Sequence, residues 1–149
     1  MKRSLLVGLL LLSLTGCSGQ STFQALEDGP CSKAQAKQVS QHISSQLQAM
    51  ADEDWLKAYT FAAPSFQKAI SVEDFQIIIE GDYSVLVSNQ GYTFANCSIS
   101  GAEISQVVNI ELPNSSSSIT YVLSVEEEKI GIVAARFSTP EDFQSAQSK

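Results

Sequence analysis

The chain has 149 residues, of which 16 are acidic and 9 are Lys or Arg, and its formal net charge is −7 at pH 7. Nucleic acid is a poor partner for such a chain, because binding to phosphates needs clustered basic residues, which this sequence lacks. The length suits one domain with its own hydrophobic core and is too short for two ordinary domains.

The N-terminus has the features of an export signal. Lys2 and Arg3 precede an apolar run from Leu5 to Leu14, which is the order of parts in a secretory signal peptide. The run is well short of the roughly 20 apolar residues that cross a bilayer. We therefore expect it to direct export without remaining as a membrane-spanning helix.

The apolar run ends at Leu14-Thr15-Gly16-Cys17, which resembles the lipobox of bacterial lipoproteins. The resemblance implies that residues 1–16 are a lipoprotein signal peptide and that Cys17 is lipidated. The alternative is an ordinary signal peptide followed by a chance cysteine. Two or three acyl chains hold a protein on a bilayer far more firmly than one. Lipidation would anchor the protein to the cell membrane on its extracytoplasmic side.

The residues that follow divide into a tether, a domain and a tail. Residues 17–30 are mostly small or polar and contain a Gly-Pro break, so they are expected to form a flexible tether with a reach of roughly 20 Å. The domain is expected over residues 31–138 and a C-terminal tail over residues 139–149. A long amphipathic helix should open the domain after Ser32, because apolar residues recur there at steps of three and four. They are Ala36, Val39, Ile43, Leu47 and Met50.

Three shorter helical segments are expected to follow. Asp54 can cap the first by accepting backbone N–H bonds, and Pro64 separates it from the second. Ser71 opens the third, which has acidic residues in its first turn and should close at Gly81. The three segments cover Trp55–Phe61, the turn that carries Phe66 and Ile70, and Phe75–Glu80.

After Tyr83 the apolar spacing changes from helical to alternating. A strand is expected over Tyr92–Ile99, and two further strands alternate apolar and polar residues, as half-buried antiparallel strands do. Helices followed by strands predict an α+β fold. The apolar faces of the two alternating strands consist of Ile104, Val108, Ile110 and Leu112, and of Ile119, Tyr121, Leu123 and Val125.

A family resemblance is carried by a set of residues in the middle of the chain. They are Asp54, Ala58, Tyr59, Phe61-Ala62-Ala63-Pro64, Phe66, Phe75 and Tyr83. The set resembles an uncharacterised bacterial domain family with the pattern D-x-x-x-A-[YF]-x-F-A-x-P, a Phe-containing helix and G-Y. With its helix order it also looks like the nuclear transport factor 2 superfamily, which includes ketosteroid isomerase and the SnoaL-like proteins. The resemblance implies a cone-shaped, cystatin-like fold with N-terminal helices packed on a curved antiparallel sheet.

Two interpretations of the aromatic residues stay open. In the simpler one they are core residues that seal the short helices over the sheet; these are Trp55, Tyr59, Phe61 and Phe66. In the other, Tyr59 and Tyr83 bind a ligand in the mouth of the cone with Asp54 or Asp82 beside them. Such pockets are mostly apolar with a few polar groups.

The sequence contains no recognisable catalytic or metal-binding motif. His42 is the single His, and its place on the flank of the helix stripe is typical of a boundary residue. Isomerase chemistry would need a carboxylate base and an oxyanion donor such as Tyr, and no such pair can be assigned. Ligand spacing for a metal and a Gly-rich phosphate loop are missing, so we expect no cofactor.

Three cysteines occur in the sequence, and lipidation of Cys17 would leave Cys31 and Cys97. An exported protein meets an oxidising environment, where an even pair is expected to form one disulfide. The alternative is two buried thiols.

Three functional hypotheses follow. The first is a membrane-anchored envelope lipoprotein with a non-catalytic interaction or assembly domain and an envelope protein as its partner. The second is a binder of a small apolar ligand in the cone cavity. The third is an enzyme of the isomerase or hydratase kind, which the missing catalytic pair disfavours.

Overall fold

Helices precede the main strands in the described part of the chain. The computed structural model describes Phe23 and residues 26–138, so the predicted signal peptide, Cys17 and the predicted tail over 139–149 lie outside the described residues. The elements in chain order are β1 (Gly29–Pro30), α1 (Lys33–Ala51), α2 (Trp55–Tyr59), α3 (Pro64–Ala69), α4 (Val72–Asp82), the 3-10 helix η1 (Ser84–Leu86), β2 (Gly91–Ser100), β3 (Glu103–Leu112), β4 (Ser115–Glu126) and β5 (Lys129–Phe137).

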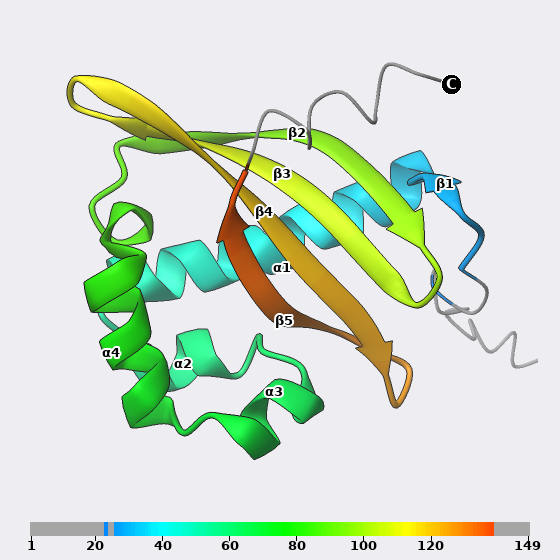
Figure 1. Ribbon diagram of the computed structural model, residues 1–149, viewed down its shortest axis with the longest axis horizontal. Helices are drawn as coiled ribbons and strands as arrows, with labels where there is room; N and C mark the ends of the chain where they lie inside the picture. The colour runs from blue at the N-terminus through cyan, green and yellow to red at the C-terminus, as the bar shows by residue number, and fades with distance from the viewer. Residues whose placement is uncertain (1–22, 24–25, 139–149) are drawn as a thin grey trace, which may run out of the picture.

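The strands form one antiparallel sheet in the order β1-β2-β3-β4-β5. The sheet is curved, and α1 crosses one of its faces while α2, α3 and α4 gather toward the end opposite β1 (Figure 1). The expected α+β fold with helices packed on a curved antiparallel sheet is confirmed. The expected meander is confirmed too, because β2 to β5 are consecutive in the chain and adjacent in the sheet.

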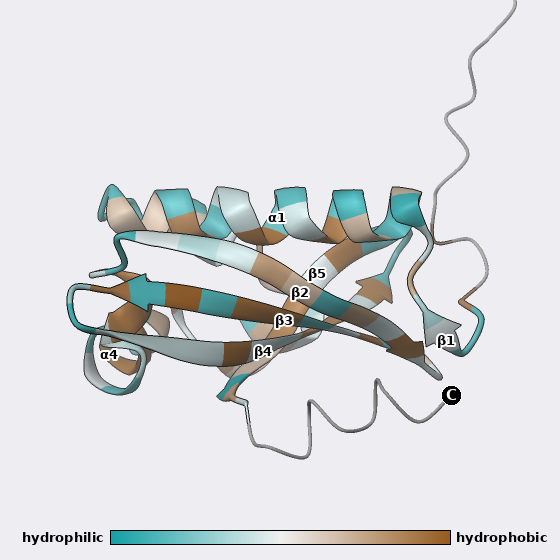
Figure 2. Ribbon diagram, turned by 90° about the horizontal axis from the view of Figure 1, so that it is seen from above, coloured by the Kyte–Doolittle hydropathy of each residue, from teal (hydrophilic) through white to brown (hydrophobic). Residues whose placement is uncertain are grey.

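Helix α1 begins and packs as its sequence predicts. Ser32 Oγ accepts from the Gln35 N–H at 3.3 Å, and Gln35 Oε1 accepts from the Ser32 N–H at 2.8 Å, which forms a capping box. Val39, Ile43 and the other predicted residues of the stripe are buried, apart from Ala36. Figure 2 shows the more hydrophobic side of α1 turned to the sheet.

The shorter helices differ from expectation at their ends. Helix α2 stops at Tyr59 and does not reach Phe61, because the next residues pair with β5: Ala63 N–H donates to Ile132 O at 2.8 Å, and Ile132 N–H donates to Phe61 O at 3.0 Å. Helix α4 does not close at Gly81 but continues to Asp82. The Tyr83 N–H still donates to Ile79 O at 3.2 Å there.

Ordered packing begins upstream of residue 31. Phe23 is only 6% exposed and belongs to the core cluster, and Leu26 packs against that cluster. Asp28 Oδ1 accepts from the Gly101 N–H at 2.7 Å, and Gly29 and Pro30 pair with β2. The flexible tether expected over residues 17–30 therefore does not extend to Pro30.

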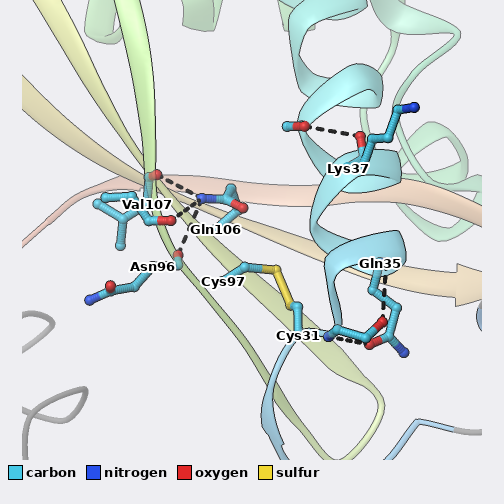
Figure 3. The surroundings of a disulfide bond; sticks show 10 residues. Cys31, Gln35, Lys37, Asn96, Cys97, Gln106 and Val107 are labelled. Atoms are coloured by element: carbon cyan, nitrogen blue, oxygen red, sulfur yellow. Dashed lines mark hydrogen bonds between the residues drawn. A yellow bond between two sulfur atoms is a disulfide. The ribbon is translucent and has the colours of Figure 1, made fainter.

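The predicted disulfide is present in the structure. Cys31 and Cys97 are joined with their Cα atoms 5.4 Å apart, and the Cys31 N–H donates to Cys97 O at 3.0 Å. The bond ties the start of α1 to β2 (Figure 3).

Beside the disulfide, β2 contains a bulge between Phe94 and Cys97. The buried amide of Gln106 serves this bulge, because its Nε2 donates to Ala95 O at 3.1 Å and to Asn96 O at 3.2 Å. A bulge interrupts the ladder between strands, and here a side chain supplies the missing donor.

Candidate functional site

A cavity of about 240 Å³ lies between the short helices and the sheet. Its lining is almost wholly apolar and comes from residues 46 to 135, so the site exists only in the folded chain. The lining residues are Gln46, Ala62, Phe66, Ile70, Phe75, Ile78, Ile79, Tyr83, Leu86, Tyr121, Ile132, Val133, Ala134 and Ala135.

One wall of the cavity is built by α3 and α4. Phe75 and Ile79 face inward from α4 and are buried, while Phe66 of α3 meets Phe75 edge to face with ring centroids 6.2 Å apart. Such aromatic pairs stabilise a packing arrangement beyond the area they bury. The opposite wall is β5 from Ile132 to Ala135, with Tyr121 of the neighbouring strand β4 beside it.

Tyr59, which we considered for ligand binding, does not line this cavity. Its hydroxyl donates to Gln67 O at 3.0 Å and to Ile70 O at 2.7 Å. The Gln67 amide in turn donates to Tyr59 O at 2.9 Å and to Ala62 O at 3.1 Å. These bonds tie α2 to the segment that contains α3, so Tyr59 positions the wall of the cavity.

Of the three predicted ligand-binding residues, the structure brings only Tyr83 to the cavity. The Tyr83 hydroxyl donates to Ala135 O at 2.6 Å. The Tyr83 ring stacks on the Phe137 ring, with the ring centroids 5.6 Å apart. Asp54 is exposed and caps α2, where its Oδ1 accepts from the Lys57 N–H at 3.1 Å. The four aromatic residues expected in the core, Trp55, Tyr59, Phe61 and Phe66, are partly buried and pack against it.

Two lining residues that we did not single out carry buried polar groups. Gln46 of α1 is 2% exposed, and its Nε2 donates to Ala58 O at 3.3 Å. Tyr121 of β4 is 1% exposed, and its hydroxyl has no hydrogen-bond partner among the described residues. Burial raises the pKa of the Tyr121 phenol well above its ordinary value of 10.0, and nearby Tyr92 adds to this shift. The phenol is therefore protonated at neutral pH.

His42 is a boundary residue, as its position on α1 predicts. Its Nε2–H donates to Phe61 O at 2.8 Å. Its ring packs edge to face against the Phe61 ring, with the ring centroids 5.2 Å apart. Partial burial lowers the pKa of the imidazole below 6.5, although the hydrogen bond to Phe61 opposes this shift. His42 does not line the cavity, so its bond to Phe61 has a structural role.

The chemistry available in the cavity is limited to apolar contact and neutral hydrogen bonding. Its lining contains no Asp, Glu, His, Lys or Arg among the residues that the structure describes. Within Phe23 and residues 26–138, no three His, Cys, Asp or Glu side chains gather where they could hold a metal ion. The same residues include no helix that is both long and apolar enough to span a membrane.

Part of this site could have been found from the sequence. Tyr121 lies on the predicted apolar face of its strand, and Gln46 comes three residues after Ile43 on the inward side of the first helix. A polar residue on an apolar face is a signal worth following. That the Tyr121 hydroxyl lacks a partner among the described residues depends on tertiary packing, which the sequence pattern does not contain.

Comparison with known families gives one match. A family model described as "Domain of unknown function (DUF4864)" matches residues 32–144. No curated protein and no solved structure matches the chain.

Proposed function

The chain belongs to the DUF4864 family, whose description names no activity, and we propose from its N-terminal sequence and its cavity that it is a lipid-anchored envelope lipoprotein that binds a small apolar ligand without catalysis. The cavity is the observation that carries the binding role. The N-terminal sequence carries the proposed location.

The lipoprotein assignment is supported by the short apolar run that ends directly at Gly16-Cys17. A disulfide between Cys31 and Cys97 agrees with it, since structural disulfides form and persist mainly outside the cytoplasm. Acylated Cys17 would be the contact with the bilayer, and the domain would stand on the extracytoplasmic side.

We further propose that the domain is a member of the nuclear transport factor 2 superfamily. The order of short helices followed by a curved antiparallel sheet supports this assignment. So does the position of the cavity, which lies between the helices and the concave sheet, where a cone-shaped fold has its mouth.

A binding role fits the cavity better than catalysis does. Ligand pockets are concave and mostly apolar, with a few polar groups that orient the ligand. This lining has that composition, and its residues with polar side chains are Gln46, Tyr83 and Tyr121. An isomerase would need a base in the pocket, and the described lining offers no carboxylate or imidazole.

An interaction domain is the second candidate, and one observation favours it. Leu56 of α2 and Ile77 of α4 are each 67% exposed, and the two helices contact each other. Large apolar side chains exposed on adjacent elements are found at protein interaction sites, although two residues make only a small patch.

Membrane anchoring is tested by Cys17→Ser in the full precursor, expressed in a bacterial host and followed by fractionation and detergent phase separation. We expect wild type in the detergent phase and the variant in the aqueous phase. Equal partitioning of the two proteins would overturn the lipoprotein assignment.

Ligand binding is tested with the neutral fluorescent probe N-phenyl-1-naphthylamine and a pair of adjacent substitutions in α4. Ile78 lines the cavity, whereas Ile77 is exposed and does not. We expect Ile78→Trp to fill the cavity and abolish the probe's fluorescence increase, and Ile77→Trp to leave it unchanged. Loss in both variants, or no increase with wild type, would contradict binding in this cavity.

A further inference from the structure

Three buried residues lie on the face of the sheet that points away from the core. Val107 of β3 is 5% exposed, and Thr120 and Val122 of β4 are 2% and 7% exposed. Val107 pairs with Thr120, and we call the three residues the outer patch. Side chains alternate between the two faces of a strand, so the outer patch points away from Val108 and Tyr121, which belong to the core cluster. Neither valine of the outer patch belongs to that cluster.

The described neighbours of the outer patch do not account for its burial. Ser105 and Ala134 flank Val122 on the adjacent strands, and their side chains are too small to cover a valine. Arg136 pairs with Thr120 and is longer, but it is itself exposed. Helix α1 lies along the other face of the sheet (Figure 2). The burial of the outer patch therefore calls for a further covering segment.

The C-terminal end of β5 lies beside the outer patch. The Ser138 N–H donates to Ser118 O at 2.8 Å, and the hydroxyls of Ser138 and Thr120 form a hydrogen bond of 2.8 Å. Ser138 therefore contacts a residue of the outer patch directly. Pro140 follows two residues later. Because proline has no backbone N–H, it cannot continue the pairing with β4 as a ladder residue does.

Residues 139–144 are long enough to return to the outer patch. Along β4, two residues separate Ser118 from Thr120, which is about 7 Å in a strand. Residues 139–143 can reach up to about 17 Å. Phe143, the large apolar residue of this segment, is thus within reach of the outer patch even if the chain turns at Pro140.

Charge and the family match favour the same segment. Glu141 and Asp142 are acidic, whereas Arg136 lies on the outer face as the pairing partner of Thr120. Opposite charges next to an apolar contact favour one docking orientation. The family match runs to residue 144, so it includes Phe143 and ends directly after it.

On these grounds we propose that residues 139–144 fold back onto the sheet and cover the outer patch, with Phe143 against Val107 and Val122. The domain then extends beyond residue 138, and its own chain closes the outer face of the sheet to other partners. This contact is on the opposite face from the cavity and does not depend on ligand binding.

The test measures how fast N-ethylmaleimide modifies a cysteine placed in the outer patch. Val122→Cys is made in the whole chain with Cys17→Ser, where the other two cysteines are joined in the disulfide and only the new thiol reacts. We expect slow modification in this protein. Adding Phe143→Ala should speed it by about 10-fold or more, because losing a buried aromatic ring shifts a packing equilibrium at least that far. Gln147→Ala, outside the proposed contact, should leave the rate unchanged.

Two controls make the result specific. Val108→Cys faces the core and reports opening of the whole domain, so Phe143→Ala should not speed its modification. Equal acceleration at positions 108 and 122, or no acceleration at position 122, would overturn the proposal. The slow rate of Val122→Cys should also be independent of protein concentration. Faster modification on dilution would mean that a second copy covers the outer patch, and would overturn the proposal too.

Discussion

Glu126 accepts both the backbone N–H and the hydroxyl of Ser65, at 2.9 and 2.6 Å. Glu126 is the last residue of β4 and Ser65 lies in the first turn of α3. The carboxylate thus caps a helix that contributes Phe66 to the cavity wall. The first turn of a helix has free N–H groups and a partial positive charge, both of which favour a carboxylate.

The Ser65 hydroxyl is the main cause of a lowered Glu126 pKa, and the Ser124 hydroxyl, at 2.9 Å, comes next. We therefore expect Ser65→Ala to raise the pKa of Glu126 more than Ser124→Ala does, in a carboxyl NMR titration. Because the folded-state pKa lies below the ordinary 4.5, the stability from this contact is present above pH 4.5 and is lost as the pH falls through the folded value. An equal shift in both variants would show that Ser65 is not the dominant partner.

His42 gives the domain a second pH dependence, in a higher range. Its pKa is lowered below 6.5 in the folded state, mainly by burial, so unfolding takes up a proton at pH values around and between the folded-state pKa and 6.5. Its contribution to stability is complete above pH 6.5 and is lost as the pH falls through the folded value. The fall in melting temperature from about pH 7.5 to about pH 5.5 should be smaller in His42→Gln, which keeps an N–H donor for Phe61 O. Identical falls in melting temperature for wild type and His42→Gln would contradict this role of His42.

At Gly131, β5 lies close to the residues before α3. A Cβ on Gly131 would lie 2.5 Å from Ala63 Cα and 2.8 Å from Ala63 N. Both are backbone atoms, and the Ala63 N–H is held by its hydrogen bond to Ile132 O of β5. We expect Gly131→Ala to destabilise the domain by about 1–3 kcal/mol in urea unfolding, as overpacking does.

Gly81 is the matched control for this substitution. It lies in α4, and nothing lies within 4 Å of its added Cβ. Gly81→Ala should stabilise the domain by about 0.5–1 kcal/mol because Ala favours helices. If Gly131→Ala and Gly81→Ala changed the free energy of unfolding in the same direction, the close backbone approach at Gly131 would not be the cause of its effect.

The disulfide joins Cys31 and Cys97, whose sequence separation is 66 residues. In the chain-entropy model, a loop of that length gives about 4 kcal/mol of stabilisation. The urea midpoint of wild type should therefore fall on reduction, toward that of the Cys31→Ser/Cys97→Ser double variant. The double variant itself should not respond to reductant. A wild-type midpoint insensitive to complete reduction would exclude a stabilising role.

Local patterns determined what the sequence predicts well. The helix α1 was predictable because its cap at Ser32 and its apolar stripe lie within one segment of chain. The strands β3 and β4 were predictable because alternation is a local signal. The pairing of Cys31 with Cys97 was predicted from the number of cysteines and from the expected export, and the two residues form a disulfide in the structure.

Contacts between segments that are distant in sequence explain where the structure differs from these predictions. The end of α2 at Tyr59 depends on Ala63 pairing with Ile132, which is far away in sequence. One of the two interpretations of the sequence placed Tyr59 in a ligand site, but its hydroxyl donates to the carbonyl oxygens of Gln67 and Ile70. Only the assembled helices show that Tyr121 is the lining residue with an unused hydroxyl.

The burial of Phe23 would limit the distance between the domain and a membrane if the protein is anchored at Cys17. If Cys17 carries the acyl chains, only residues 18–22 separate the anchor from a side chain packed in the core. Six residue steps span at most about 20 Å even when fully extended. The β1 end of the molecule would then rest close to the lipid head groups. Because the helices that form the cavity lie toward the opposite end (Figure 1), a ligand would be received from the aqueous side and not drawn directly from the anchoring leaflet.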